Sequence, residues 1–422
     1  MRADSYLIDN SKALVPDSYA IGCALDRIAF ASLWLFVFMI PWEEASPLVG
    51  GFVIGRWIGL LTFGVLVLRI AATGRLRKLS VPHGLMLGLV AWAALSILWT
   101  MDQDTTITRL GTYAQLLLAV WMIWELAVAE DRVARLLEAF VWGASVLSIS
   151  TIVNFIRGRQ AADLWAEHGL TRWREARYTV YGLNENDLGL ILALSLPMTL
   201  YLLTRRKGTP ALLLGWLQIG LCLTSIFLSG SRGAVIATMV ALLMLPLVMY
   251  RLQRWMRFAL VLACAGGLAC GTFLIPDGTW RRILSAGSEV SQGTMTHRTL
   301  LWEAGLDAFR DRAFTGVGAG AYGAAVLRAV DMPYVAHNTF LSVLVELGVA
   351  GALLYLALLA SLSYSALRMA YLEKCLWTIL MLTWAVGVLA LTWDYYKPTW
   401  FLFGLLTAQA YPLGNKRLEA QS

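Results

Sequence analysis

Long apolar runs separated by short polar connections dominate the chain. A membrane-spanning helix needs about 20 mostly apolar residues. Twelve segments satisfy this requirement, at roughly 20–41, 50–72, 83–100, 109–129, 135–156, 187–204, 210–229, 233–250, 257–276, 338–367, 375–393 and 399–414. The long run at 338–367 is expected to tilt or protrude. The pattern predicts an all-α polytopic membrane protein with about 12 transmembrane helices, in which residues 1–422 form a single integral membrane domain.

Composition agrees with this pattern. Of the 422 residues, 59% are hydrophobic and 14% are charged, whereas roughly 25% of a soluble protein is charged. The 18 tryptophans suit many membrane–water interfaces. The five cysteines show neither a disulfide framework nor a metal-binding spacing. Residues 1–20 contain no long apolar stretch, so we expect no cleavable signal peptide.

Basic residues in the short connections predict the orientation of the spans. Lysine and arginine favour cytoplasmic loops, and they gather in alternate connections at Arg75, Arg77, Lys78, Arg132, Arg135, Arg205, Arg206, Lys207, Arg251, Arg254, Arg257, Arg368 and Lys374. The C-terminal Lys416 and Arg417 fall on the same side. The remaining short connections are acidic or neutral, as in PWEEASP (41–47) and MDQDTT (101–106). Twelve spans with both termini in the cytoplasm fit every short loop.

Two long connections, 157–186 and 277–337, fall on the outer side and are rich in arginine. Long loops are exempt from the charge rule. Their arginines include Arg157, Arg159, Arg172, Arg174, Arg177, Arg281, Arg282, Arg298, Arg310, Arg312 and Arg328. One interpretation is a surface facing solvent or lipid headgroups. The other is a site for an anionic substrate, because the planar guanidinium matches phosphate oxygens.

The segment THRTLLWEAGLDAFRDRAF (296–314) has an amphipathic pattern inside the second long connection. Leu301, Leu306 and Phe309 supply apolar surface, and Arg310 is among its polar residues. The pattern predicts a helix that lies on the outer membrane surface or caps a cavity.

Two short motifs carry candidate arginines. In LSGSRGAV (228–235), small residues surround Arg232 and allow a tight turn that leaves the guanidinium uncovered. Contact with lipid phosphate is one role for Arg232, and contact with substrate phosphate is the role we favour. In GTMTHRTLLW (293–302), His297 and Arg298 begin the amphipathic helix, whose N-terminus favours anions. For His297, an exposed or helix-capping role is the better interpretation.

Two further patterns are weaker. GAGAYG (318–323) matches a dinucleotide-binding pattern, but it lacks the βαβ context and is better explained as a tight turn that allows close backbone packing. Asp102 and Asp104 have a spacing that could hold Mg²⁺, yet acidic residues at the end of a span are the better interpretation. Glu43 and Glu44 are similar.

The segment DMPYVAHNTFL (331–341) places His337 and Asn338 at the entry to an apolar run. A hydrogen-bonded interfacial histidine is the ordinary interpretation. However, His337 lies on the same face as the arginine-rich loops, and Asn338 beside it supplies both donors and acceptors. An imidazole is a suitable general base for a hydroxyl.

Taken together, these segments resemble a known family. SGSRGA at 229–234, HRTLLWEAGLDAFRDRAFTGVGAGAYG at 297–323 and AHNTFLSVLVELGVAG at 336–351 are similar to the O-antigen ligase/polymerase superfamily. GLNENDLG (182–189), with Asn184 and Asn186, looks like that family's entry to the sixth span. The motifs cover about 182–351, and the twelve-span topology extends the resemblance over the chain.

The resemblance implies a membrane-embedded glycosyltransferase of the C type, with a helical periplasmic segment between spans 9 and 10. It implies transfer of a glycan from undecaprenyl diphosphate to a sugar hydroxyl of lipid A–core, on the periplasmic face of the bacterial inner membrane. It implies no nucleotide sugar, no cofactor and no metal, and no nucleic-acid partner is expected.

Residue by residue, His337 matches the family's essential histidine. Arg232 and Arg298 match the arginines of its SRG and HR motifs. Of the arginines in the loop 157–186, Arg177 and Arg174 are the candidates for diphosphate binding, and Arg177 is nearest the span. Asn338, Asn184 and Asn186 are candidate supporting residues.

Three rival functions stay open at this point. An O-antigen polymerase uses the same donor with a second carrier-linked glycan as acceptor. A protein O-oligosaccharyltransferase uses a protein acceptor, and the moderate length of the chain argues against it. A transporter of small anions would require ionisable residues near mid-span, where Arg56 and Glu346 are the main examples. The sequence leaves the acceptor, the glycan and the oligomeric state undetermined.

Overall fold

The computed structural model describes residues 17–45, 48–49, 52–166, 177–205, 209–249, 298–330 and 333–418, together with isolated residues between 254 and 269. Helices occupy the places of the expected spans. They are α1 (Asp17–Met39), α2 (Ile54–Thr73), α3 (Val81–Leu95), α4 (Gln103–Leu126), α5 (Glu130–Ile156), α7 (Glu185–Arg205), α8 (Thr209–Leu228), α9 (Arg232–Leu242), α10 (Met244–Met249), α16 (Thr339–Leu367), α17 (Tyr371–Gly387) and α18 (Lys397–Leu418). The chain is thus an all-α polytopic membrane protein. Most of the expected ninth span, 257–276, lies outside the described residues.

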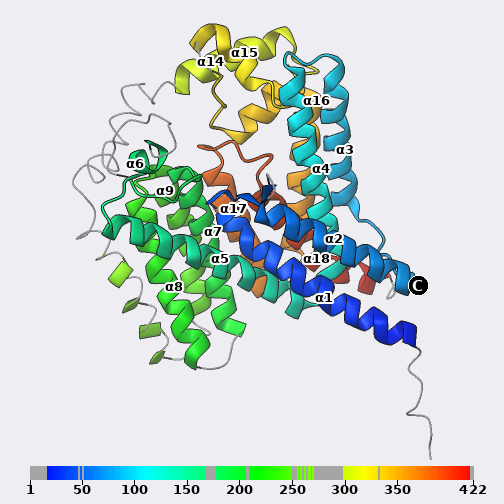
Figure 1. Ribbon diagram of the computed structural model, residues 1–422, viewed down its shortest axis with the longest axis vertical. Coiled ribbons are helices and arrows are strands. Elements are labelled where there is room, and N and C mark those ends of the chain that lie inside the picture. Colours follow the sequence, from blue (N-terminus) through cyan, green and yellow to red (C-terminus); the bar gives the residue numbers. More distant parts are fainter. Residues whose placement is uncertain are drawn as a thin grey trace, which may run out of the picture.

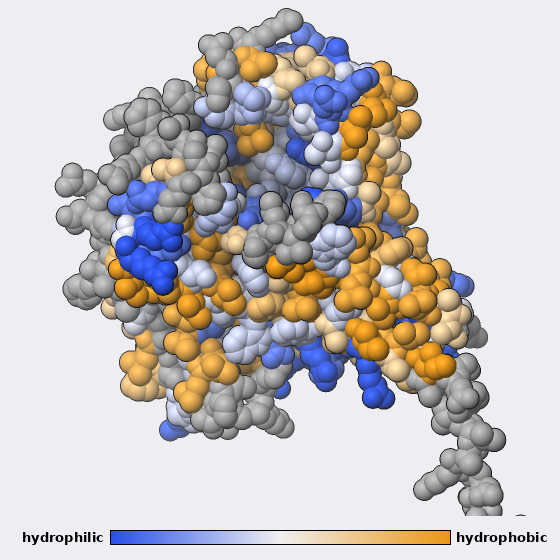
Figure 2. Space-filling view, viewed as in Figure 1, coloured by the Kyte–Doolittle hydropathy of each residue, from blue (hydrophilic) through white to orange (hydrophobic). Residues whose placement is uncertain are grey.

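Six segments of the described part are long and apolar enough to cross a membrane without help from a neighbour. They are Ile21–Ala45, Ile54–Thr73, Val81–Leu98, Glu130–Ile156, Glu185–Arg205 and Thr339–Leu367. Five of these segments, all except Glu185–Arg205, expose large apolar side chains, and α2 alone exposes Trp57, Leu60, Leu61 and Leu68. Figure 2 shows such apolar surface over the flanks of the molecule. Because water would penalise these faces, they indicate contact with lipid.

Helix α7 forms the centre of the bundle. Nearly all its residues are buried, and it packs against α5, α8, α9 and α17 (Figure 1). Gly189 allows the approach to α9, because a Cβ on this residue would lie 2.3 Å from that of Ala234. Glycine at this position therefore allows α7 and α9 to pack closely.

Short elements join the spans. They are η2 (Ile40–Ala45), η3 (Ser96–Leu98), α6 (Ala161–Ala166), and the two-residue strands β1 (Leu48–Val49) and β2 (Phe52–Val53), which pair antiparallel. Two expected boundaries are wrong. Helix α17 ends at Gly387 instead of 393, and the eighth span consists of two helices, α9 and α10. The early end of α17 leaves residues 388–396 as a linker, here called the α17–α18 linker.

A small second layer covers one end of the bundle. It contains α14 (Arg298–Asp311) and α15 (Tyr322–Val330), which lie at the top of Figure 1. Helix α14 confirms the expected amphipathic helix. The two helices share an apolar core with the start of α16, formed by Leu301, Val317, Ala321, Tyr322, Val326, Ala336 and Val345. The Tyr322 hydroxyl donates to the carbonyl of Leu301 over 2.8 Å, so this layer is held by a hydrogen bond as well as by packing.

Helix α16 is interrupted at Gly348, where φ is +66° and ψ is −170°. An interruption frees backbone groups that lipid cannot satisfy. The chain between α14 and α15 satisfies them. The N–H groups of Val317 and Gly318 donate to the carbonyls of Val345 and Glu346 over 3.0 and 2.9 Å, and Val349 donates to Ala313 over 2.8 Å.

The glycines of the GVGAGAYG segment make this contact possible. Gly316, Gly318 and Gly320 all have positive φ. A Cβ on Gly316 would lie 2.4 Å from the carbonyl oxygen of Glu346. This confirms that the segment is a turn for close backbone packing.

Candidate active site

His337 lies in the loop that enters α16 and has a left-handed backbone, with φ of +48°. Among the described residues it is the only non-glycine residue with positive φ. Both its neighbours are fixed. The carbonyl of Ala336 accepts a 2.9 Å hydrogen bond from the Trp302 indole of α14, and the Asn338 side chain caps α16 by accepting from Leu341 N–H over 3.0 Å. Asn338 therefore supports His337 through the backbone.

The imidazole of His337 is half-buried beside Arg298. Burial, with the positive charge of Arg298, lowers the pKa of His337 to about 4. Both effects penalise the protonated ring. At neutral pH the imidazole is uncharged, so one ring nitrogen has a lone pair that can accept a proton.

The first residue of α16 is bonded to the α17–α18 linker. Thr339 N–H donates to the carbonyl of Val388 over 3.0 Å. Its hydroxyl donates to the carbonyl of Leu391 and accepts from Trp393 N–H, both at 2.8 Å. The loop that carries His337 is thus held between α14 and the linker.

Arg232 is the first residue of α9, directly after the tight turn at 229–231. Gly230 has φ of +61°, and the Ser231 side chain caps α9 by accepting from Ala234 N–H over 3.3 Å. The guanidinium-bearing residue is half-buried. The small residues make the tight turn that the sequence predicts, and the turn also places Arg232 at the N-terminus of α9.

Arg177 is buried against the same turn. Its Nε donates to the carbonyl of Ser229 over 2.9 Å, and its terminal nitrogens contact Asn186 at 3.0 Å and Glu185 at 3.5 Å. Asn184 in turn accepts from Asn186 N–H over 2.9 Å. Arg177 therefore has a structural role in joining the loop to the turn. Arg174 lies outside the described residues.

Contacts of the α17–α18 linker bring the His337 loop close to the segments that carry Arg177 and Arg232. The indole of Trp393 donates to Asp187 at the start of α7 over 2.7 Å, while the same residue bonds Thr339 through its backbone. The structure thus gathers the starts of α7, α9 and α16, and Arg298 begins α14 beside His337. Figure 2 shows the surface hollowed below the α14–α15 layer, with hydrophilic residues in the hollow. His297 lies outside the described residues.

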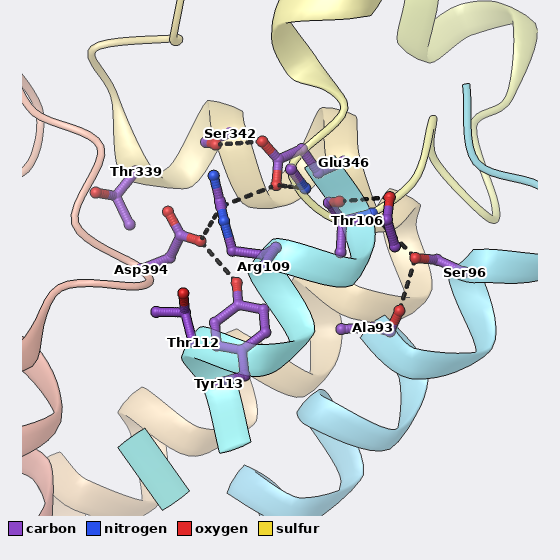
Figure 3. A network of polar contacts seen from close by, with 12 residues as sticks. Ala93, Ser96, Thr106, Arg109, Thr112, Tyr113, Thr339, Ser342, Glu346 and Asp394 are labelled. Carbon is purple, nitrogen blue, oxygen red and sulfur yellow. Dashed lines mark hydrogen bonds and ion pairs between the residues drawn. The ribbon is translucent and has the colours of Figure 1, made fainter. Parts of the chain in front are cut away.

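A buried network of charged side chains lies between α4, α16 and the α17–α18 linker (Figure 3). The Arg109 guanidinium of α4 lies 3.4 Å from Glu346 and 3.3 Å from Asp394. Tyr113 donates to Asp394 over 2.7 Å, and Gly320 N–H donates to Glu346 over 2.7 Å. The network connects α4, α16, the linker and the glycine-rich turn. The sequence analysis identifies Glu346 as an ionisable residue near mid-span, but it identifies neither Arg109 nor Asp394.

The acidic candidates of the sequence have structural partners. Asp102 caps α4 by accepting from the Thr105 N–H and hydroxyl over 3.0 and 2.7 Å, and these bonds lower its pKa. Glu43 forms an ion pair with Lys397. Within the described ranges, no group of three or more histidine, cysteine, aspartate or glutamate residues could hold a metal ion.

The fold is that of a polytopic membrane protein, and the candidate residues His337, Arg232 and Arg298 lie where helices begin. Residues 217–356 match the family model described as O-antigen ligase. The match contains Arg232, Arg298 and His337, and it confirms the resemblance to the O-antigen ligase superfamily. It supports glycan transfer of the ligase or polymerase type, with a lipid-linked glycan and a lipid acceptor in general. None of the curated proteins compared with the chain matches it.

Proposed function

We propose that this protein is an O-antigen ligase. It transfers a glycan from undecaprenyl diphosphate to a sugar hydroxyl of lipid A–core, as the last step of lipopolysaccharide maturation. The single observation that carries the proposal is the position of His337, half-buried beside Arg298 within the segment that matches the family.

His337 acts as the general base. Its free ring nitrogen takes the proton of the acceptor hydroxyl while that oxygen bonds to the anomeric carbon of the donor. The bond from this carbon to the diphosphate oxygen breaks, and its electron pair leaves with undecaprenyl diphosphate. Direct displacement inverts the configuration at the anomeric carbon. The lowered pKa keeps the ring in its base form at neutral pH. It also makes the ring a weaker base, because a general base is most effective when its pKa lies near the operating pH.

Arginines stabilise the departing diphosphate. Arg232 and Arg298 each begin a helix, so their guanidinium groups and the free N–H groups of α9 and α14 favour an anion together. Arg177 holds the turn before Arg232, where its own charge is paired with Glu185, and Arg174 is proposed as a further diphosphate ligand from its place in the sequence alone. Preorganised charges of this kind stabilise charge that develops as the bond breaks, so no metal is required.

The site lies on the periplasmic face of the bacterial inner membrane, with both termini in the cytoplasm. The charge pattern of the short loops supports this orientation. The membrane provides both substrates, since the carrier and lipid A–core are lipids.

Reconstitution tests the proposal. The purified full chain is placed in liposomes with carrier-linked glycan and lipid A–core, and the products are separated on a gel. Glycosylated lipid A–core supports the ligase. Longer carrier-linked glycans without a lipid A product would identify a polymerase instead, and a product only with an added pilin-like acceptor would identify a protein-modifying enzyme. Solute uptake without transfer would indicate a transporter.

The same assay with excess EDTA tests whether transfer needs a metal. Activity is expected to survive. Loss of activity that Mg²⁺ restores would contradict metal-independent catalysis by arginine. It would instead favour a Mg²⁺ site at Asp102 and Asp104.

A further inference from the structure

A groove of about 520 Å³ lies at the C-terminal end of α5, separate from the residues of the candidate site. It is formed by α5, η2, the start of α6 and the segment around residue 180. The lining residues are Trp42, Ala45, Val146, Leu147, Ile149, Ser150, Val153, Asn154, Arg157, Arg159, Leu164, Val180 and Tyr181.

Polarity changes in one direction along this groove. Val146, Ser150, Val153 and Arg157 recur at intervals of three or four residues, so they share one face of α5. Toward the N-terminus of α5 this face is mostly apolar, and Arg157 and Arg159 lie at its C-terminal end. Eleven residues of helix separate Val146 from Arg157, which corresponds to about 16 Å. The groove therefore offers an apolar floor that leads to two positive charges.

The groove lies at the level of a membrane interface. Helix α5 has 27 residues, or about 40 Å at the helical rise, so its ends reach both headgroup regions. Ile149 and Ile156 on this part of α5 are 49% and 75% exposed, which indicates a face turned toward lipid. Trp42 and Tyr181 add the aromatic rings that favour the interface. Figure 2 shows hydrophilic and apolar surface side by side over this end of α5.

We propose that this groove binds an anionic phospholipid of the adjacent leaflet. The lipid phosphate contacts Arg157 and Arg159, and an acyl chain lies along Val153, Ser150 and Val146. Charge complementarity and the order of polarity along α5 carry the inference, which does not depend on the proposed glycan transfer.

The cations of the groove are distinct from those of the candidate site. Arg177 does not line the groove, because its guanidinium is turned toward Ser229 and Asn186. The two regions nevertheless share a wall. Asn154 donates to the carbonyl of Thr179, and Ala161 N–H donates to the carbonyl of Arg177, both over 2.8 Å. A lipid in the groove therefore supports the segment that positions Arg177.

Native mass spectrometry of the full chain in detergent tests the proposal, with phosphatidylglycerol and phosphatidylcholine of equal chain length as probes. Phosphatidylglycerol is expected to bind more tightly. An arginine near a membrane surface contributes an attraction that corresponds to about fivefold in affinity. The double variant Arg157→Ala/Arg159→Ala should therefore lose at least about fivefold in phosphatidylglycerol binding. The matched control is Arg310→Ala, since Arg310 is an exposed arginine paired with Asp307 on α14.

A second variant separates a seated lipid from charge attraction alone. Ser150→Phe fills the floor of the groove and leaves both arginines in place, so it should also reduce phosphatidylglycerol binding. Unchanged binding in Ser150→Phe would overturn the proposal, because it would show that no acyl chain enters the groove. Equal affinity for both phospholipids would overturn it as well. So would displacement of phosphatidylglycerol by undecaprenyl phosphate at equal concentration, which would assign the groove to the carrier.

Discussion

His337 combines a backbone in the left-handed region with an uncharged imidazole, and the two properties arise from different contacts. The backbone is held by Trp302 on one side and by the Asn338 cap on the other. The low pKa comes from burial and from Arg298. Strained backbone at a site of this kind is maintained only when the surroundings hold it firmly. The contacts of Trp302 and Asn338 hold the backbone of His337 in this conformation.

The variant His337→Asn tests the base without disturbing the loop. Asparagine tolerates a left-handed backbone better than alanine does, so the protein should fold with an unchanged melting temperature. Loss of a general base typically reduces the rate by about 10²–10⁴-fold. Transfer is therefore expected to fall by this factor in the liposome assay, with donor binding retained. Near-normal transfer would exclude His337 as the base.

The pH profile of kcat/KM provides a second test of His337. The active form is neutral, so activity is lost as the pH falls through the pKa of the free enzyme. The pKa of His337 is about 4 instead of about 6.5. The acid limb of the profile should therefore lie at a lower pH than it would for an unperturbed histidine. Arg298→Gln removes a nearby positive charge, so the pKa should rise and the limb should move to higher pH. Arg310→Gln serves as the control, and its limb should not move.

Arg177 and Arg232 should respond differently to substitution. Arg177→Lys cannot reproduce three separate contacts with Ser229, Asn186 and Glu185, so its melting temperature should fall together with its activity. Arg232→Ala should weaken donor use with little effect on the melting temperature. Thermal unfolding in detergent and the KM for the donor distinguish the two outcomes. A stable Arg177→Lys protein with normal transfer would show that the turn does not depend on these contacts.

At the scale of elements, the interruption of α16 is maintained by a single residue type. Gly348 has φ and ψ values that are essentially limited to glycine, and a Cβ there would lie 2.2 Å from the carbonyl oxygen of Phe314. The interruption divides α16 into a first, mostly buried part that carries the His337 loop and a second part that exposes Leu353, Leu356 and Leu367. The orientation of the site depends on the angle between them.

Gly348→Ala should therefore destabilise the protein, by at least about 1–3 kcal/mol for the strained backbone alone. The clash with Phe314 should also displace the turn and reduce transfer. The matched control is Gly64→Ala in α2, where a Cβ would meet no atom within 4 Å and alanine favours the helix. The melting temperatures of the two variants in detergent check the prediction. Equal values would contradict it.

At the scale of the whole molecule, the Arg109 network joins segments that are far apart in sequence. Arg109 is separated by 237 residues from Glu346 and by 285 from Asp394. Both carboxylates share one guanidinium, which also stacks on the Tyr395 ring at 3.6 Å. The network connects α4 and α16 with the α17–α18 linker and with the glycine-rich turn between α14 and α15.

Removal of Arg109 should be costly because it leaves two buried carboxylates without their cation. Breaking a buried ion pair in this way typically costs about 3–5 kcal/mol. Arg109→Met is therefore expected to lower the melting temperature strongly. The double variant Arg109→Met/Glu346→Gln, which removes one carboxylate charge as well, should recover part of the loss. A double variant no more stable than Arg109→Met would contradict the electrostatic explanation.

The hydrophobic pattern predicts the spans and the amphipathic α14, because both depend on local composition. It fails at 388–393, where the apolar residues form part of the linker. That segment forms turns and bends, and its backbone bonds Thr339, a contact that no local pattern shows. The motifs locate His337, Arg232 and Arg298. They do not show the partners of Arg177, nor the importance of Arg109 and Asp394, which in the sequence are ordinary charges at the ends of spans.

The exchange of backbone bonds between 313–318 and 345–350 limits how the chain can change in length. An insertion or deletion within either stretch would shift the register of all the backbone hydrogen bonds between the two stretches, and no substitution elsewhere could restore that register. Among the described residues, 333–335 lie between α15 and the His337 loop and do not take part in the exchange. Related chains are therefore expected to accept insertions around residue 331 and to keep both six-residue stretches free of them.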